Sequence, residues 1–262
     1  MAKFENHIPV ILANEGGSRY SDESGDPGNF VNGVLVGSRY GVTPVAYWTE
    51  FGRFPTAAEM RNLPEAQARQ VYKSQFWDKI GGDSLPESQM TTAIFDFYVN
   101  SPKGAGVVLQ TLLNAAGQSL KVDGSIGPNT RNALSHVTGA GIDIYNDYRE
   151  GRLAFYAWKG GKSTPPEWAT VFQDNGIAKG NSPFYQGWVN RVNNSFPARA
   201  QVQPGVYRGT PLPEVNARAS REVWMRIGLQ VPAVLLGAAV VAYALTWLRR
   251  TYLTAKAARV ST

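Results

Sequence analysis

The spacing of apolar residues predicts a body that is mainly helical over residues 1–196. In residues 4–14, Phe4, Ile8 and Ile11 recur three or four positions apart, which places them on one face of a helix that ends at Glu15. Similar patterns predict further helices over residues 44–51, 56–60, 64–76, 91–100 and 104–116. Residues 25–43 are rich in glycine and β-branched residues, which predicts a small β-hairpin.

Three segments carry signals that are typical of the start of a helix. Thr56 and Glu59 have the spacing of a capping box, in which each side chain bonds the backbone N–H of the other residue. Pro64 suits the first position of its helix, because proline lacks the backbone N–H that is unpaired there. Residues 123–130, D-G-S-I-G-P-N-T, are typical of a turn that leads into a helix.

An uncharged apolar stretch over residues 227–248 predicts a membrane-spanning helix. At ~1.5 Å per residue this stretch would be about 33 Å long, enough to cross a hydrocarbon core of ~30 Å. The whole helix is expected over residues 223–250, followed by a basic tail over 251–262; the alternative is a buried core helix. Residues 197–222 contain several prolines and no apolar periodicity, so they are expected to form a linker.

Composition excludes several kinds of site. The chain has no cysteine, which removes disulfides, thiolate zinc sites and cysteine nucleophiles. His7 and His136 lack the spacing of a metal site, so neither a metal nor an organic cofactor is expected. The net charge of +6 suits an anionic polymer, a membrane face or a bacterial wall. The basic residues of the body are scattered, so no nucleic-acid partner is expected.

Residues 14–28, N-E-G-G-S-R-Y-S-D-E-S-G-D-P-G, hold the best candidate for catalytic chemistry. Glycoside hydrolysis needs a protonated carboxyl group as general acid and usually a second carboxylate. Glu15 would end an apolar helix beside a cleft, where desolvation favours a protonated carboxyl, and Gly16 and Gly17 would let the backbone approach a sugar. Asp26 lies in a D-P-G turn that could aim a second carboxylate at the same place. The commoner interpretation of this pattern alone is that Glu15 ends its helix in solvent.

Several motifs resemble the signature of the glycoside hydrolase 108 muramidases, which are lysozyme-like enzymes of phages and bacteria. The similar segments are N-E-G-G (14–17), D-P-G (26–28), S-R-Y-G-V-T (38–43), Q-F-W-D-K-I (75–80) and F-D-F-Y-V-N-S (95–101). Residues 109–110, 122–130 and 187–192 are similar to a peptidoglycan-binding module. The resemblance implies a mainly α, lysozyme-like α+β fold, with a catalytic domain over residues 1–100 and a helical wall-binding module over 101–196.

The resemblance also implies roles for individual residues. Glu15 would be the catalytic acid and Asp26 the second carboxylate. Ser38 and Thr43 fall on the two threonines of the family's T-x-x-G-I-T motif, and either hydroxyl could hold the water. The residues expected to bind substrate are Gly16, Gly17, Tyr20, Tyr40 and Asn100. About nine extra residues precede S-R-Y-G-V-T, and they would lengthen the hairpin at the edge of the cleft.

The remaining polar residues of these segments are expected to be structural. Asp22 and Glu23 are expected to be solvated loop charges. Asp96 lies in an apolar run, so it is expected to be buried and hydrogen-bonded. Asn100 could bind an N-acetyl group, although capping of the next helix is favoured.

Together these features predict a membrane-anchored muramidase that cleaves the β-1,4 bond between N-acetylmuramic acid and N-acetylglucosamine. The alternatives are a lytic transglycosylase, which forms a 1,6-anhydro product without water, and a non-catalytic wall-binding protein. The expected partners are peptidoglycan, a membrane through residues 227–248 and other virion proteins. The apolar run near the N-terminus is too short for a signal peptide. A body without a leader but with a C-terminal span suits a phage virion protein that acts on the host periplasm and wall, at entry or at lysis.

Overall fold

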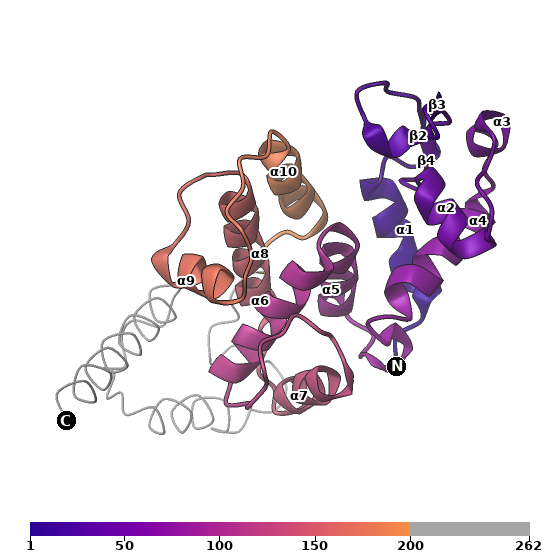
Figure 1. Cartoon of the computed structure of the whole chain (residues 1–262). Helices are drawn as coiled ribbons and strands as arrows, with labels where there is room; N and C mark the ends of the chain where they lie inside the picture. The colour runs from indigo at the N-terminus through magenta and orange to yellow at the C-terminus, as the bar shows by residue number, and fades with distance from the viewer. Residues whose placement is uncertain (200–262) are drawn as a thin grey trace. The chain divides into compact units, whose positions relative to one another are not determined.

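The computed structural model describes residues 1–199 of the chain (Figure 1). These residues fall into two compact units. The first unit contains residues 1–153 together with the segment that begins at Pro183. The second unit is Ala154–Ser182. The predicted linker beyond residue 199, the membrane helix over 223–250 and the basic tail lie outside the described residues.

Helices dominate both units. The first unit contains α1 (Phe4–Asn14), α2 (Pro44–Phe51), α3 (Ala57–Arg61), α4 (Glu65–Tyr72), α5 (Gln89–Asn100), α6 (Pro102–Ala115), α7 (Pro128–Gly139), most of α8 (Tyr145–Lys159) and α10 (Tyr185–Ser195). The second unit contains the end of α8 and α9 (Pro166–Asp174). Among residues 1–199, no helix is both long enough and apolar enough to cross a membrane. The described chain is therefore mainly helical, as the sequence predicts.

Helix α1 is built around the predicted apolar face. Phe4, Ile8 and Ile11 are all buried, and Phe4 packs edge-on against Trp77 with ring centroids 5.8 Å apart. The helix ends at Glu15, its C-cap residue, and Gly16 then takes a positive φ of 87°. Glycine adopts this conformation without steric cost, so the chain can leave the helix sharply at this point. The predicted bounds of this helix are confirmed.

The capping signals are confirmed at Thr56 and corrected at Pro64. Thr56 and Glu59 form the reciprocal capping box at the start of α3. Pro64 is the N-cap of α4 rather than its first helical residue, and α4 begins at Glu65. The α-helical pattern predicted to run to residue 76 stops at Tyr72. A wider turn, Lys73–Trp77, follows, in which the Asp78 N–H bonds the Lys73 carbonyl at 2.8 Å.

Two short antiparallel ribbons form the β region between α1 and α2. The inner ribbon pairs β2 (Phe30–Val31) with β3 (Val34–Leu35), and Asn32 and Gly33 between them both have positive φ. This is the turn geometry that suits a tight hairpin. The outer ribbon pairs β1 (Tyr20–Ser21) with β4 (Ser38–Arg39). The predicted hairpin is therefore confirmed, with a second ribbon outside it.

A buried polar side chain joins two of the later helices of the first unit. Pro128 begins α7, which confirms the turn-to-helix pattern of residues 123–130. Buried Gln110 of α6 holds that turn, because its side-chain amide accepts from the Gly124 N–H at 2.8 Å and donates to the Ser125 carbonyl at 2.9 Å. The second unit has its own contacts, including the edge-on pair of Phe155 and Phe172 at 5.5 Å.

Candidate active site

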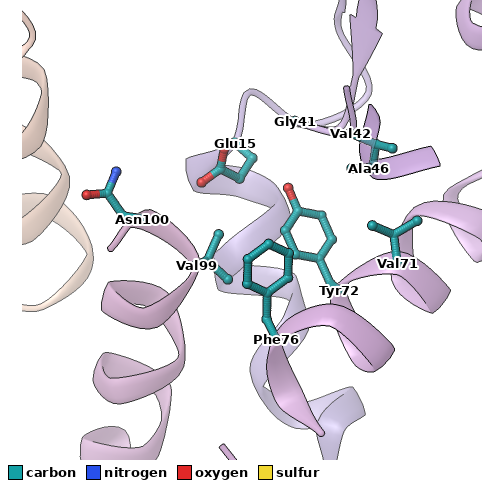
Figure 2. A pocket seen from close by; sticks show the side chains of 9 residues that line it. All are labelled: Glu15, Gly41, Val42, Ala46, Val71, Tyr72, Phe76, Val99 and Asn100. Atoms are coloured by element: carbon teal, nitrogen blue, oxygen red, sulfur yellow. The ribbon is translucent and has the colours of Figure 1, made fainter. Parts of the chain in front are cut away.

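Glu15 borders a small pocket in the first unit (Figure 2). The cavity has a volume of about 190 Å³, and its lining residues are Glu15, Gly41, Val42, Ala46, Val71, Tyr72, Phe76, Val99 and Asn100. Polar side chains enter this lining at Glu15, which is the C-cap of α1, at Tyr72 of α4 and at Asn100 of α5, and the other lining residues are apolar or glycine. The Glu15 side chain is 23% exposed, so it is sheltered but reachable. The arrangement therefore offers one carboxylate in a small pocket of mixed polar and apolar lining.

Gly41 lines the pocket at a position that has no room for a larger residue. A Cβ atom built on Gly41 would lie 2.6 Å from the Tyr72 hydroxyl and 2.8 Å from Oε2 of Glu15. Its φ of +71° is also a conformation that side-chain-bearing residues rarely adopt. The Tyr72 hydroxyl donates to the Tyr40 carbonyl at 2.8 Å, and this bond ties α4 to the loop before α2. Burial raises the pKa of Tyr72 well above its ordinary value, and the negative charge of Glu15 adds to that effect.

The Glu15 carboxylate is held by an arginine from the other end of the described chain. Nη1 of Arg191, on α10, donates to Oε1 of Glu15 at 2.6 Å. The same guanidinium donates through Nη2 to Oδ1 of Asp96 at 2.7 Å and through Nε to Oδ2 at 3.0 Å. Burial alone would lower the pKa of Arg191, but the charges of Asp96 and Glu15 outweigh it and raise that pKa. Arg191 therefore bridges the two carboxylates.

Asp96 is the buried centre of this network. Its side chain is 0% exposed, accepts from Nη2 of Arg152 at 2.6 Å and accepts from the Asn14 amide at 2.9 Å. Burial alone would raise the pKa of Asp96, but the charges of Arg152 and Arg191 outweigh it and lower that pKa. The prediction that Asp96 is a buried, hydrogen-bonded acid is confirmed.

The predicted second carboxylate lies in the loop before the hairpin. Oδ1 of Asp26 accepts from the Gly28 N–H at 2.9 Å, so this carboxylate caps the short turn Pro27–Asn29. A Cβ atom built on Gly28 would lie 3.1 Å from Oδ1 of Asp26 and 3.7 Å from Cγ2 of Thr43. The Thr43 hydroxyl itself accepts from the Ala46 N–H at 3.3 Å at the start of α2. Asp26 and Thr43 thus both lie beside Gly28, and neither residue is among those that line the pocket.

The other predicted residues of the hairpin have packing roles. Ser38 lies in β4 opposite Ser21. The Tyr20 hydroxyl donates to the Val36 carbonyl at 2.9 Å, and its ring covers Gly37, where a Cβ atom would meet the hydroxyl at 2.5 Å. Tyr40 is buried, with a φ of 54°. Tyr20 and Tyr40 are thus fixed by their own neighbours rather than placed in the pocket lining.

The predicted glycines and Asn100 lie nearer the carboxylate. Gly16 and Gly17 both have positive φ, and a Cβ atom on either would meet nothing within 4 Å, so the space above them is open. Asn100 is the last residue of α5 and lines the pocket. The favoured role of Asn100 as a helix cap is wrong, because the Ser101 hydroxyl accepts from the Gly104 N–H and caps α6.

Sequence reasoning missed Arg191 and Tyr72. The signal for Arg191 was indirect: a buried Asp96 needs a cation, and Arg191 lies in the segment G-W-V-N-R-V that resembles a wall-binding module. Nothing in the sequence pairs it with Glu15, since 176 positions separate the two. Within residues 1–199, no group of three or more His, Cys, Asp or Glu side chains could hold a metal ion.

Comparisons with known proteins agree with the resemblance in the sequence. Residues 8–101 match the family model described as Glycosyl hydrolase 108, and residues 104–193 match the one described as Predicted Peptidoglycan domain. A similar solved structure, titled "Structure of Brucella abortus SagA", is 27% identical; the match covers 73% of this chain and 90% of that chain, with a TM-score of 0.50. No curated protein matches the chain. The match over residues 8–101 indicates that the chain is a glycoside hydrolase of the lysozyme type.

Proposed function

We propose that this glycoside hydrolase cleaves the β-1,4 bond between N-acetylmuramic acid and N-acetylglucosamine in peptidoglycan, with Glu15 as the general acid. The observation that carries the proposal is the position of Glu15, which lines a small pocket and lies beside two glycines with open space above them. The match of residues 104–193 to a peptidoglycan domain supports the choice of polymer. The basic net charge of +6 suits the same anionic wall.

In this mechanism Glu15 delivers its proton to the bridging oxygen as the glycosidic C–O bond breaks. The bonding electrons stay with that oxygen, and positive charge develops on the sugar ring. Water then supplies a hydroxyl group to the anomeric carbon and a proton to a base. Asp26 is the candidate for the second carboxylate, because its loop is beside Thr43 at the start of α2, the helix that contributes Ala46 to the pocket.

A lytic transglycosylase is the second candidate. Such an enzyme needs the Glu15 acid but no carboxylate to activate water, because the muramic acid C6 hydroxyl closes the 1,6-anhydro ring. The observation that favours it is the place of Asp26, which caps its own turn and does not line the pocket. The reducing ends of the products distinguish the two reactions.

A non-catalytic wall-binding protein is the third candidate. In that case Glu15 would serve only to end α1 and to hold Arg191. Binding to peptidoglycan would then be the whole activity, and replacing Glu15 by glutamine would leave that activity unchanged.

For the cellular setting, we propose a phage virion protein anchored through residues 223–250, which acts on the host wall. The support is the charge-free stretch over 227–248, which is long enough to span a hydrocarbon core. Purified virions should contain the protein in their detergent-soluble fraction. Its absence from purified particles would reject this setting without affecting the proposed chemistry.

The chemistry is tested by digesting purified peptidoglycan with the full chain, as wild type and as Glu15→Gln, and identifying the products by mass spectrometry. Muropeptides with reducing-end muramic acid from the wild type alone would support a muramidase. Anhydro-muramic products would support the transglycosylase and keep Glu15 as the acid. If neither protein releases products while both bind the wall, the enzymatic proposals are wrong.

A further inference from the structure

The segment that matches the peptidoglycan domain supplies a residue to the candidate catalytic carboxylate. Arg191 lies within residues 104–193, and Glu15 lies within residues 8–101, which match the glycosyl hydrolase 108 model. Nη1 of Arg191 nevertheless donates to Oε1 of Glu15 at 2.6 Å, inside one compact unit. Any role of this contact in the reaction would make the second segment part of the active site rather than a separate wall anchor.

The guanidinium of Arg191 is held in place by a residue other than Glu15. Its Nε and Nη2 atoms make a two-pronged contact with the buried Asp96 carboxylate, at 3.0 Å to Oδ2 and 2.7 Å to Oδ1. Asp96 is itself held by Arg152 and Asn14. Because a guanidinium is planar and rigid, a fork–fork contact on one edge sets the direction of the remaining N–H groups. Nη1 is therefore aimed at Glu15 by the surrounding helices.

The two carboxylate oxygens of Glu15 face different neighbours at the end of α1. Glu15 is the C-cap of α1, and the next two residues are glycines with positive φ, so the helix does not continue past it. Arg191 takes one carboxylate oxygen, Oε1. The other oxygen, Oε2, lies against Gly41 in the pocket lining, where a Cβ atom would be only 2.8 Å from it.

We propose that Arg191 is a positioning residue of the active site: by holding Oε1 of Glu15, it makes Oε2 the oxygen that delivers the proton. This inference rests on the proposed function of Glu15. The proton leaves Oε2 for the bridging oxygen, the C–O bond breaks with its electrons on that oxygen, and Glu15 is left as a carboxylate. The Arg191 charge stabilises that carboxylate as it forms, in a sheltered site where such stabilisation is strongest.

The test compares substitutions in α10 of the full chain. Arg191→Met removes the charge and the fork, and Arg191→Lys keeps the charge but loses the planar geometry. Asn193→Ala is the matched control, because the Asn193 side chain accepts from Nη2 of Arg149 on α8 at 2.6 Å and so joins α10 to another helix without touching Glu15 or Asp96. Release of soluble fragments from peptidoglycan is followed as kcat and KM.

The expected result is a loss in kcat with little change in KM. Misplacing a reacting group by about 1 Å can cost about 10²-fold in rate, so Arg191→Met should lose roughly that factor. Arg191→Lys should lose about tenfold in kcat. Asn193→Ala should retain wild-type values.

Three outcomes would overturn the inference. Wild-type kcat in Arg191→Met would show that Glu15 needs no orientation. Equal losses in Arg191→Met and Asn193→Ala would show that α10 only packs against its neighbouring helices. Should Arg191→Met not fold, full activity of Arg191→Lys would reject the need for the planar fork. A wild-type chain without Glu15-dependent products would instead overturn the proposed function, and the positioning role with it.

Discussion

Replacing Asp96 with asparagine should destabilise the protein far more than the same replacement at the surface. Asp96 is 0% exposed and lies between Arg152 and Arg191, whose side chains are 2% and 11% exposed. The change keeps the shape of the side chain but leaves both guanidinium groups facing a neutral amide. Breaking a buried ion pair by removing one partner costs about 3–5 kcal/mol. For a folded body of this size, each kcal/mol lowers Tm by roughly 2–4 °C, so Tm should fall by about 10 °C.

The matched control is Asp143→Asn. Asp143 pairs with Arg199 at 2.7 Å, but the two side chains are 62% and 37% exposed. Exposed pairs contribute about 0–1 kcal/mol, because water screens the charges and two long side chains must be ordered. Differential scanning calorimetry of the full-length variants measures both changes. If Asp96→Asn lowers Tm no more than Asp143→Asn does, then burial does not make the Asp96 network strong, and the reasoning is wrong.

Three further predictions concern Asp96, two glycines and the cap of α3. The pKa of Asp96 is lowered in the folded chain. The contribution of Asp96 to stability is therefore fully present above its unfolded pKa of about 3.9 and is lost as pH falls through the lowered folded pKa. Tm measured from pH 6 to pH 2 should fall more steeply in the wild type than in Asp96→Asn. Gly41→Ala should abolish most activity and reduce stability. Gly52→Ala has the same φ of +71° but nothing within 4 Å of its Cβ, so it should cost only the backbone strain of about 1–2 kcal/mol. Urea denaturation measures the free energy of unfolding of both variants. Thr56→Ala should lower the free energy of unfolding by about 1 kcal/mol without changing the products of wall digestion, because it removes only the cap of α3.

Local chemistry made much of the fold predictable. Helix α1 follows from apolar spacing, α7 follows from the turn signal that ends in a proline, and the β region follows from the glycine and β-branched content of residues 25–43. Glu15 was found because a short motif surrounds it. The end of α4 was not predictable in this way, because the apolar pattern continues through the wider turn after Tyr72 and periodicity does not distinguish the two helical forms.

The site itself depends on contacts that sequence does not display. Tyr72 reaches the loop at Tyr40 across 32 positions, and Arg191 reaches Glu15 across 176. Such pairings are set by how helices pack, and no local propensity encodes them. Burial of Asp96 gave the one usable hint, since a buried carboxylate must find cations or donors. The expected burial of Asp96 indicates that partners exist, but it does not identify them as Arg152 and Arg191.

These long-range contacts bear on where a folding unit ends. The predicted catalytic domain stops at residue 100, yet Asp96 within it depends on Arg152 and Arg191 beyond it. A fragment of residues 1–101 would keep the Asn14 amide as a partner for Asp96 but would lose both cations, and it would expose the face of α5 that packs on α6. Losing these ion pairs together with the covered apolar surface of α5 removes much of the stability of a small domain. The fragment should therefore show no cooperative thermal transition, whereas residues 1–199 should melt cooperatively. A cooperative transition in residues 1–101 would mean that the Asp96 network is an addition to an already stable domain, and that Arg191 serves the site without supporting the fold.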